Sequence, residues 1–341
     1  MLVTGATGLV GSHVVEAALR RGWRVRALVR SASSGQALEE LGTELAIGDL
    51  GDPASLKAAT RDATVIVHCA AKVGDWGAVE DYRRINVDGV RTLIDAAEQG
   101  GQLRRFVHIS SLGVYPARDH FGTDEDTPPS ATGIDGYTLT KVEAEQLVVE
   151  RARQTGLPAV VLRPGFIYGP RDRTILPKLW ERLKSGQFAY LGSPDKVMNN
   201  TYVGNLVDAI FLAIARDDVL GRVYNITDGR LVTKREFIET IATAAEVPPP
   251  TKVVPLGLAR VIARGLEYLY KLLGKQEAPL LSNARIKFLG LNLDYCIDRA
   301  RRELGYAPAV DFQEGMTTTL DWQRNEMSKT GRAGGESLTP R

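Results

Sequence analysis

One tyrosine and one lysine, Tyr137 and Lys141, have a type and spacing that suit acid–base chemistry. Residues four apart lie on one face of a helix, so the lysine ammonium would stand next to the phenol. A nearby positive charge favours the phenolate and lowers a tyrosine pKa that starts near ~10. Such a tyrosine can exchange a proton with an alcohol or carbonyl oxygen while hydride moves to or from a nicotinamide. The lysine could also hold the nicotinamide ribose, although the same pair is common on solvated helix faces.

Three further polar side chains could complete this site. Ser110 and Ser111 follow an apolar run that predicts a strand, and a hydroxyl at the carboxyl end of a strand can hydrogen-bond a reacting oxygen. We expect Ser111 in that role, with Ser110 as its competitor and a turn or helix cap as the structural alternative. Asn86 opens the segment Asn-Val-Asp-Gly-Val. It could anchor a proton-relay water or the lysine backbone, or it could be the N-cap of a helix.

The first residues of the chain contain three evenly spaced glycines, Gly5, Gly8 and Gly11, between a β-branched run and a helical pattern. The first would let the chain turn sharply out of a strand. The second would let backbone approach a ligand, and the third would let helix and sheet pack closely. Backbone N–H groups and the helix dipole at such a helix start favour an anion. The pyrophosphate of a dinucleotide suits this geometry, although glycine-rich turns also occur as ordinary tight loops.

The choice between NAD and NADP depends on the end of the second expected strand. An NAD site usually carries a carboxylate there for the ribose 2′-OH, but residues 28–31 read Leu-Val-Arg-Ser. Arg30 offers planar donors that suit a 2′-phosphate, so we predict NADP(H), with NAD possible if Arg30 is only a solvated strand end. Asp49 follows the third expected strand and could contact the adenine amino group. It could equally cap the next helix, with Asp52 as its rival for capping.

Strand and helix patterns alternate along the first half of the chain. The near-continuous apolar run 64–70, for example, is typical of a strand buried on both faces. Further strands are expected at 24–29, 44–47, 106–111 and 159–163, and helices at 55–59, 87–99 and 137–153. This alternation predicts parallel β-α-β units with right-handed crossovers. We therefore predict an α/β fold, a Rossmann-type doubly wound parallel sheet with its ligands at the carboxyl ends of the strands.

The pattern changes after Pro170, where the strands become shorter. Helices are expected at 175–186, 206–215 and 233–245, and strands at 199–203 and 222–226. We assign residues 1–170 to an NAD(P)-binding Rossmann domain, to which residues 203–230 return. Residues 171–202 and 231–327 would form a smaller substrate-binding lobe. Residues 328–341 lack aromatic side chains and periodicity, and we expect a disordered tail there.

The bulk composition is typical of a globular enzyme. The chain has 341 residues, 44% of them hydrophobic and 25% charged. Its formal net charge of +2 gives no argument for a nucleic-acid partner. No stretch is long and apolar enough to predict a spanning helix. The two cysteines, Cys69 and Cys296, are far apart in sequence, which favours a reduced, cytoplasmic protein. The chain begins inside its first expected strand, so we expect no signal peptide, and we expect no metal site.

Taken together, these motifs resemble the extended short-chain dehydrogenases/reductases of the NAD-dependent epimerase/dehydratase superfamily. The matching pieces occur in family order over residues 1–230, at 4–11, 48–50, 68–71, 86–89, 110–111, 137–141 and 163–170. The resemblance implies that Ser111, Tyr137 and Lys141 are the catalytic triad and that Asn86 is the auxiliary asparagine. It also implies a homodimer through the helices that contain Val87 and Tyr137. The expected cofactor contacts are Gly5, Thr7, Gly8, Leu9, Val10, Gly11, Arg30, Asp49, Leu50, Ala70, Ala71, Lys72, Ser110, Tyr137, Lys141, Pro164, Gly165 and Ile167.

Within this family, Asn-Thr-Tyr-Val-Gly-Asn at 200–205 resembles the 3β-hydroxysteroid dehydrogenase group, whereas sugar-nucleotide epimerases usually carry Val-Asp-Asp there. The stretch 71–77 resembles bacterial members that include the 2-alkyl-3-oxoalkanoate reductases. Two departures concern the substrate: Arg30 replaces the acidic residue of the NAD-using steroid enzymes, and residues 203–208 match neither subgroup fully. The resemblance implies an NADP(H)-dependent oxidoreductase that interconverts a secondary alcohol and a ketone on an apolar substrate.

Two other functions remain open. A sugar-nucleotide epimerase or dehydratase with tightly held NAD is the first, because Lys178, Arg182 and Lys184 could face a charged nucleotide diphosphate. The second is a non-catalytic, cofactor-sensing scaffold, against which the intact Ser-Tyr-Lys set argues.

Residues 257–274 predict a strongly amphipathic helix. Its apolar face consists of Leu258, Val261, Ile262, Leu266, Leu269, Leu272 and Leu273. This face could pack against the core, as in an ordinary helix of the substrate lobe. Alternatively, it could form a lid over an apolar substrate or a peripheral contact with a membrane surface. In the steroid dehydrogenase group the matching region is associated with membrane attachment and the substrate entrance.

Overall fold

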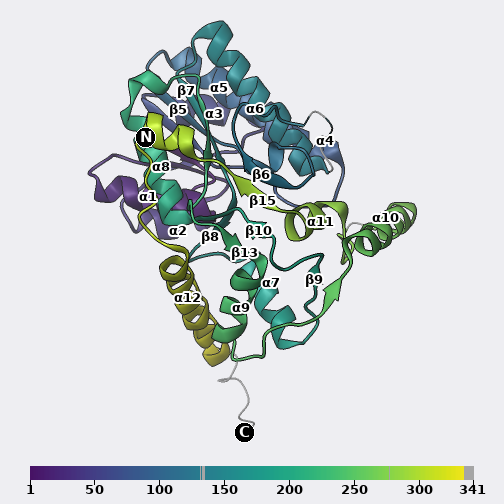
Figure 1. Ribbon diagram of the computed structural model, residues 1–341. Helices are drawn as coiled ribbons and strands as arrows, with labels where there is room; N and C mark the ends of the chain where they lie inside the picture. The colour runs from purple at the N-terminus through teal and green to yellow at the C-terminus, as the bar shows by residue number, and fades with distance from the viewer. Residues whose placement is uncertain (131, 133–134, 276, 334–341) are drawn as a thin grey trace.

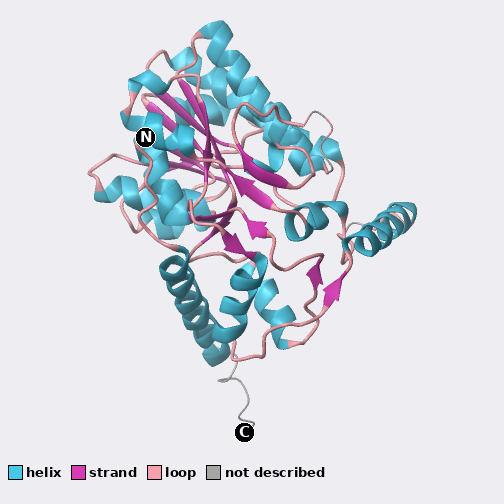
Figure 2. Ribbon diagram, in the orientation of Figure 1, coloured by secondary structure: helices cyan, strands magenta, loops and turns pink. Residues whose placement is uncertain are grey.

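The structure is a computed structural model that describes residues 1–130, 132, 135–275 and 277–333. Its centre is a seven-stranded parallel sheet with helices on both faces (Figures 1 and 2). The strands are β1 (Leu2–Thr4), β2 (Arg26–Val29), β3 (Glu44–Ile47), β4 (Val65–His68), β5 (Arg105–Ile109), β7 (Ala159–Pro164) and β12 (Val223–Ile226). Their order is β12-β7-β5-β4-β1-β2-β3. The predicted Rossmann-type fold is confirmed, and the strand order reverses beside β1, where such sheets bind ligands.

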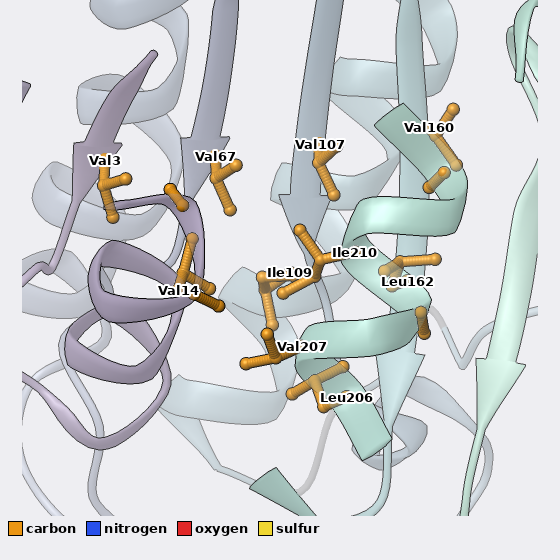
Figure 3. Packing of buried hydrophobic residues seen from close by; sticks show 14 of the residues in the cluster. Val3, Val14, Val67, Val107, Ile109, Val160, Leu162, Leu206, Val207 and Ile210 are labelled. Atoms are coloured by element: carbon orange, nitrogen blue, oxygen red, sulfur yellow. The ribbon is translucent and has the colours of Figure 1, made fainter. Parts of the chain in front are cut away.

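The sheet has an apolar core on each face. Neighbouring residues of each strand point to opposite sides and so contribute to different cores. On one face, Val3, Val67 and Val107 pack against α1 (Leu9–Arg20) and α8 (Val203–Ala215), as Figure 3 shows. On the other face, Leu2, Ile66 and Phe106 form a second cluster. Its helices are α3 (Pro53–Thr60), α5 (Gly89–Gly100) and α6 (Gly136–Thr155). These two cores hold the carboxyl ends of the strands at one edge.

Shorter elements connect these layers. They are α2 (Ala32–Glu39), α4 (Val79–Arg83), the π-helix η1 (Arg84–Asp88), the 3₁₀-helices η2 (Leu112–Val114) and η3 (Asp217–Val219), and β6 (His120–Thr123). The structure thus divides the predicted helix 87–99 between η1 and α5, and α4 precedes both.

The second half of the chain builds a smaller aromatic core beside the sheet. Phe166, Trp180, Phe237 and Phe312 are buried there together. Its elements are β8 (Phe166–Tyr168), α7 (Leu176–Lys184), β9 (Tyr190–Leu191), β10 (Val197–Met198), β11 (Asn200–Tyr202), β13 (Val232–Thr233), α9 (Lys234–Ala244), β14 (Val253–Val254) and α12 (Phe312–Ala333). The strands form two-stranded pairs, β8 with β11, β9 with β14, and β10 with β13.

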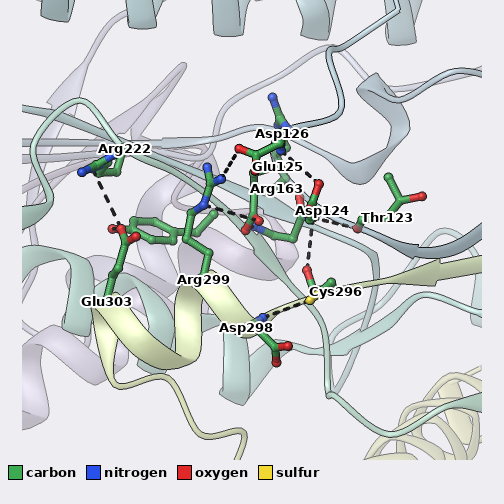
Figure 4. A network of polar contacts seen from close by, with 12 residues as sticks. Thr123, Asp124, Glu125, Asp126, Arg163, Arg222, Cys296, Asp298, Arg299 and Glu303 are labelled. Carbon is green, nitrogen blue, oxygen red and sulfur yellow. Dashed lines mark hydrogen bonds and ion pairs between the residues drawn. The ribbon is translucent and has the colours of Figure 1, made fainter.

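Part of the last third packs against the core of the Rossmann sheet. Strand β15 (Leu293–Tyr295) pairs with β6, and the π-helix η4 (Ala300–Leu304) places Ala300 and Leu304 in the core beside α8. Figure 4 shows Arg299 in ion pairs with Glu125 and Asp126. The assignment of this stretch to the substrate lobe therefore needs correction, because its apolar side chains are buried against the Rossmann core.

The end of α12 also differs from expectation. The helix continues to Ala333, so residues 328–333 are helical and the expected disordered tail is wrong for them. No glycine or proline interrupts the helical pattern between Gly315 and Gly331, and the Ser328 hydroxyl donates to the Arg324 carbonyl one turn earlier. The rest of the expected tail, residues 334–341, lies outside the described residues.

Helix α10 (Leu256–Leu272) projects from the body of the protein (Figure 1). Only Ala259 and Ala263 of this helix are buried. Its exposed apolar side chains are Leu258, Val261, Ile262, Tyr268, Leu269 and Leu272, followed by Leu273. The apolar face points to solvent, so the interpretation that it packs against the core is wrong. Among the described helices, none combines the length and apolar character that crossing a bilayer would require.

Candidate active site

The glycine turn after β1 has no room for side chains. Gly5 adopts φ +64°, and a Cβ there would lie 2.7 Å from the backbone nitrogen of Ala70. A Cβ on Gly11 would lie 2.2 Å from the carbonyl oxygen of Gly5. The turn is closed by a hydrogen bond from the Gly8 amide to the Gly5 carbonyl, at 3.0 Å. Helix α1 is thereby pressed onto the end of β1.

This helix start fits a pyrophosphate. Gly8 is the N-cap of α1 and has no side chain that could cap the helix. The amides of Leu9, Val10 and Gly11 therefore donate to no capping side chain. Thr7 and Gly8 are exposed beside these amides. An anion there would meet backbone donors and the positive end of the helix dipole. The half-buried residues Ala70, Ala71 and Lys72 follow β4, the strand beside β1.

Arg30 and Asp49 lie at the ends of the next two strands. Arg30 follows β2 and is exposed, and Ser31 after it caps α2 by accepting from the Ser34 amide. Asp49 is exposed and accepts from the Gly51 amide at 2.9 Å, whereas Asp52 is the residue that caps α3. The alternative that Asp49 caps the helix is therefore wrong. Leu50 is buried against α5, where it leaves no space for a Cβ on Gly89.

The catalytic candidates meet where β5 ends and α6 begins. Asp135 caps α6 through a 2.8 Å bond from the Thr138 amide, which places Tyr137 in the first turn. Tyr137 and Ser111 share a side-chain hydrogen bond. The Ser111 oxygen also accepts from the Gly113 amide at 2.9 Å. Ser111 therefore faces the tyrosine and caps η2 at the same time.

The pKa of Tyr137 is shifted in the direction opposite to the expected one. Burial raises it to about 12, and the hydrogen bond with Ser111 only partly opposes that effect. The lysine is not aimed at the phenol, because Lys141 Nζ donates to the carbonyl of Ile109 at 2.6 Å. Burial in turn lowers the pKa of Lys141 to about 8. The expectation that Lys141 depresses the pKa of Tyr137 is thus not met in this structure.

Ser110 and Asn86 have roles in positioning their neighbours. Ser110 points into the interior and donates to Glu145 at 2.6 Å, so Ser111 is the serine that faces the tyrosine. Asn86 lies inside η1, and the alternative that it is an N-cap is wrong. Its amide oxygen accepts from the Lys72 backbone amide at 2.7 Å, and its amide nitrogen donates to the Lys72 carbonyl at 3.0 Å. The same nitrogen also donates to the Thr140 hydroxyl. It therefore ties the loop after β4 to the catalytic helix.

Pro164 and Gly165 form the turn between β7 and β8. A Cβ on Gly165 would lie 1.6 Å from the carbonyl oxygen of Asn199, so only glycine fits. The Gly165 amide donates to the Thr201 hydroxyl at 3.0 Å. Ile167, two residues further, is half-buried against the core of the sheet. These residues border the same carboxyl edge as Ser111.

Two site residues escaped the sequence analysis. Asp135 could have been found from its position, since Asp is among the preferred N-cap residues and stands two residues before Tyr137, at the start of the predicted helix. Lys287, on α11 (Asn283–Gly290), reaches the loop that follows Ser111 and donates to the carbonyls of Gly113 and Tyr115, at 2.6 and 2.7 Å. No local pattern marks Lys287, because its partners lie far away in the sequence.

The geometry of the glycine turn gives a direct test. We expect Gly11→Ala to weaken binding of NADPH or NADH roughly tenfold or more, because α1 must move away from Gly5. Gly265→Ala is the matched control, since a Cβ at that helical glycine meets open space. Fluorescence titration measures both affinities, with circular dichroism to check folding. A Gly11→Ala protein that binds dinucleotide like the wild type would contradict this assignment.

Comparisons with known proteins agree with this geometry. A family model described as the NAD dependent epimerase/dehydratase family matches residues 1–227. A ketoreductase from Stigmatella aurantiaca, acting on 4-hydroxy-2-methyl-3-oxo-4-farnesyl-3,4-dihydroquinoline-1-oxide, is 33% identical over 92% of this chain and 93% of its own. A 2-alkyl-3-oxoalkanoate reductase from Shewanella oneidensis is 29% identical over 92% of this chain and 84% of its own.

Two further matches cover nearly the whole chain. A 3-beta-hydroxysteroid dehydrogenase from Mycolicibacterium neoaurum is 31% identical over 94% of this chain and 90% of its own. The crystal structure of gox2253 superimposes with a TM-score of 0.80 and 31% identity, and the match covers 95% of this chain and 98% of that one. The predicted resemblance is confirmed, and this chain belongs to the NAD dependent epimerase/dehydratase family.

Proposed function

We propose that the protein is an NADP(H)-dependent oxidoreductase that interconverts a secondary alcohol and a ketone on an apolar substrate. The observation that carries this proposal is the meeting of Ser111, Tyr137 and Lys141 at the end of β5, on the same carboxyl edge of the sheet as the glycine turn. Similarity to a ketoreductase and to a hydroxysteroid dehydrogenase supports it. When bound, the nicotinamide would supply hydride to the ketone or accept it from the alcohol, and the protein correspondingly supplies or accepts the proton.

Each of the three residues has a distinct task in this proposal. Tyr137 gives its proton to the carbonyl oxygen during reduction, and its raised pKa keeps the phenol protonated at neutral pH. Ser111 donates a second hydrogen bond to that oxygen and orients the carbonyl. Lys141 holds a positive charge beneath the site and is the ribose contact. Asn86 and Asp135 fix the two segments that carry these groups.

The tyrosine gives the central test of function. We expect Tyr137→Phe to lower kcat for ketone reduction roughly 10²–10⁴-fold, because the reacting oxygen loses its proton donor. Tyr268→Phe, at an exposed tyrosine, should leave turnover intact.

The substrates for this assay are ketosteroids, β-keto acids and nucleotide sugars, each with NADPH and NADH. Intact turnover by Tyr137→Phe would overturn the catalytic assignment. Turnover of nucleotide sugars alone, with cofactor bound after purification, would favour an epimerase or dehydratase. Tight cofactor binding without turnover of any compound would favour a cofactor-sensing scaffold.

Arg30 supports the choice of NADP(H). It is exposed at the end of β2, where the sequence offers no carboxylate for a ribose 2′-OH. We expect Arg30→Ala to weaken NADPH binding about tenfold and to leave NADH binding unchanged, because only NADPH carries the 2′-phosphate. Arg24→Ala, at an exposed arginine before the start of the same strand, is the control. Equal losses for both cofactors would contradict an Arg30–phosphate contact.

We further propose a homodimer through α5 and α6 and a cytoplasmic location. The family resemblance supports the dimer. Cys69 and Cys296 are both free thiols, which is consistent with a reducing compartment.

We also propose that α10 makes peripheral contact with a membrane surface. The support is its exposed apolar face together with the exposed basic residues Arg260, Arg264 and Lys271 on its polar flank. A helix of this kind can lie in the interface of an anionic bilayer. This contact would place the substrate lobe next to the lipid bilayer, in which apolar substrates dissolve.

Vesicle sedimentation tests this contact. We expect the wild-type protein to sediment with phosphatidylglycerol vesicles, and Val261→Asp/Leu272→Asp to lose most of that binding, because two charges enter the apolar face. Phe121→Asp places a charge at an equally exposed apolar residue outside α10 and should bind like the wild type. Absence of wild-type binding, or equal binding by all three proteins, would contradict the proposal.

A further inference from the structure

Glu145 continues the spacing of the catalytic residues along α6. Tyr137, Lys141 and Glu145 follow one another four residues apart and therefore share a face of the helix. The side chain of Glu145 is only 3% exposed. The chemistry described above gives it no task, although a carboxylate at this depth is costly unless it is paired.

The Glu145 carboxylate contacts residues from two neighbouring strands, Ser110 at the end of β5 and Arg163 on β7. Ser110 donates to its Oε2 at 2.6 Å, and Arg163 Nε donates to the same oxygen at 3.0 Å. Arg163 Nη2 contacts the other oxygen, Oε1. Arg163 is anchored in turn by Tyr115, whose hydroxyl accepts from Nη1 at 2.7 Å. Ser110 stands between Ile109, whose carbonyl accepts from Lys141, and Ser111. By binding Ser110, the Glu145 carboxylate therefore fixes the end of β5 that carries both residues.

The surroundings of Lys141 contain few charges. His68 and Cys69, at the end of β4, and His108, on β5, are close enough for the charge of Lys141 to lower the pKa of each. Burial lowers the pKa of His68 to about 3 and that of His108 well below its usual value, so both rings are neutral at pH 7. Burial raises the pKa of Cys69 to about 12, so the thiol is neutral too.

The phenol of Tyr137 is likewise neutral at pH 7, because burial raises its pKa to about 12. Among the groups in the described part of the chain that raise the pKa of Lys141, Glu145 has the larger effect and Cys69 the smaller one.

We propose that Glu145 is a positioning residue that, through Ser110, holds the end of β5 in register with Tyr137 and places its carboxylate on the same face of α6 as Lys141. This inference rests on the proposed function, because its effect on turnover requires that the Ser111–Tyr137–Lys141 set is catalytic.

The sign of the effect follows from the charges. Burial lowers the pKa of Lys141 to about 8, and the carboxylate opposes that shift. Without the negative charge the pKa falls further, so the ammonium is lost at lower pH. Activity that needs protonated Lys141 then disappears earlier as pH rises. For a fall of about one pKa unit, the protonated fraction drops about fivefold at pH 8 and changes little at pH 6.

The experiment compares Glu145→Gln with Glu150→Gln, an exposed glutamate on the same helix. We expect the alkaline limb of kcat/KM for ketone reduction to move about one pH unit down in Glu145→Gln only. Because Glu145→Gln alone leaves Arg163 buried without a charge partner, a double variant Glu145→Gln/Arg163→Gln restores a neutral hydrogen-bonded pair. The double variant should show the same shift.

A second measurement does not depend on turnover. The Nζ of Lys141 is titrated in ¹⁵N-lysine-labelled protein, with the signal assigned by Lys141→Arg. We expect a lower pKa in both Glu145 variants. Folded variants that lose only thermal stability, with the wild-type Lys141 titration and pH profile, would overturn the inference and leave Glu145 a structural residue. A wild-type protein without ketone reduction would overturn the proposed function, yet the Lys141 titration would still decide the role of Glu145.

Discussion

The contact between α1 and the turn after β1 is the constraint on which the site depends. A side chain at Gly11 would collide with the carbonyl of Gly5, so the helix start can approach the strand end only because both residues are glycine. That approach places uncapped helix amides beside the point where the strand order reverses. The carboxyl ends of β5 and β7 continue the same edge of the sheet beyond β4. This is the edge at which Ser111, Tyr137 and Pro164 lie.

The parallel sheet explains why so much of this site could be predicted from the sequence. Gly5, Arg30, Ala70, Ser111 and Pro164 each mark the end of a different strand, and parallel strands bring all their carboxyl ends to one edge. A motif that the sequence places at a strand end is therefore also expected to lie near the other motifs at that edge of the sheet. The strands themselves could be predicted from largely apolar runs. Val65–His68 and Ala159–Pro164 are buried on both faces, and such strands are largely apolar in sequence.

The properties that the sequence did not predict are set by distant contacts. The four-residue spacing of Tyr137 and Lys141 is local, but the direction of the lysine is decided by the carbonyl of Ile109. The amphipathic pattern of 257–274 identifies an apolar face and says nothing of what covers it. Residues 297–306 resemble the rest of the second half in pattern, yet Ile297 and Tyr306 are buried beside α8 and the sheet.

The loop 111–115 is held by groups from both halves of the chain. Glu145 holds Ser110 just before it, Lys287 binds the carbonyls of Gly113 and Tyr115, and Asn225 accepts from the Tyr115 hydroxyl. Removing one partner leaves a buried polar group unsatisfied, at about 1–3 kcal/mol each. Helix α11 also binds the loop after β4, through Arg285 and Asp75 at 2.7 Å. Because α11 bonds both loops, any displacement of α11 must disturb the Ser111 loop and the loop after β4 together.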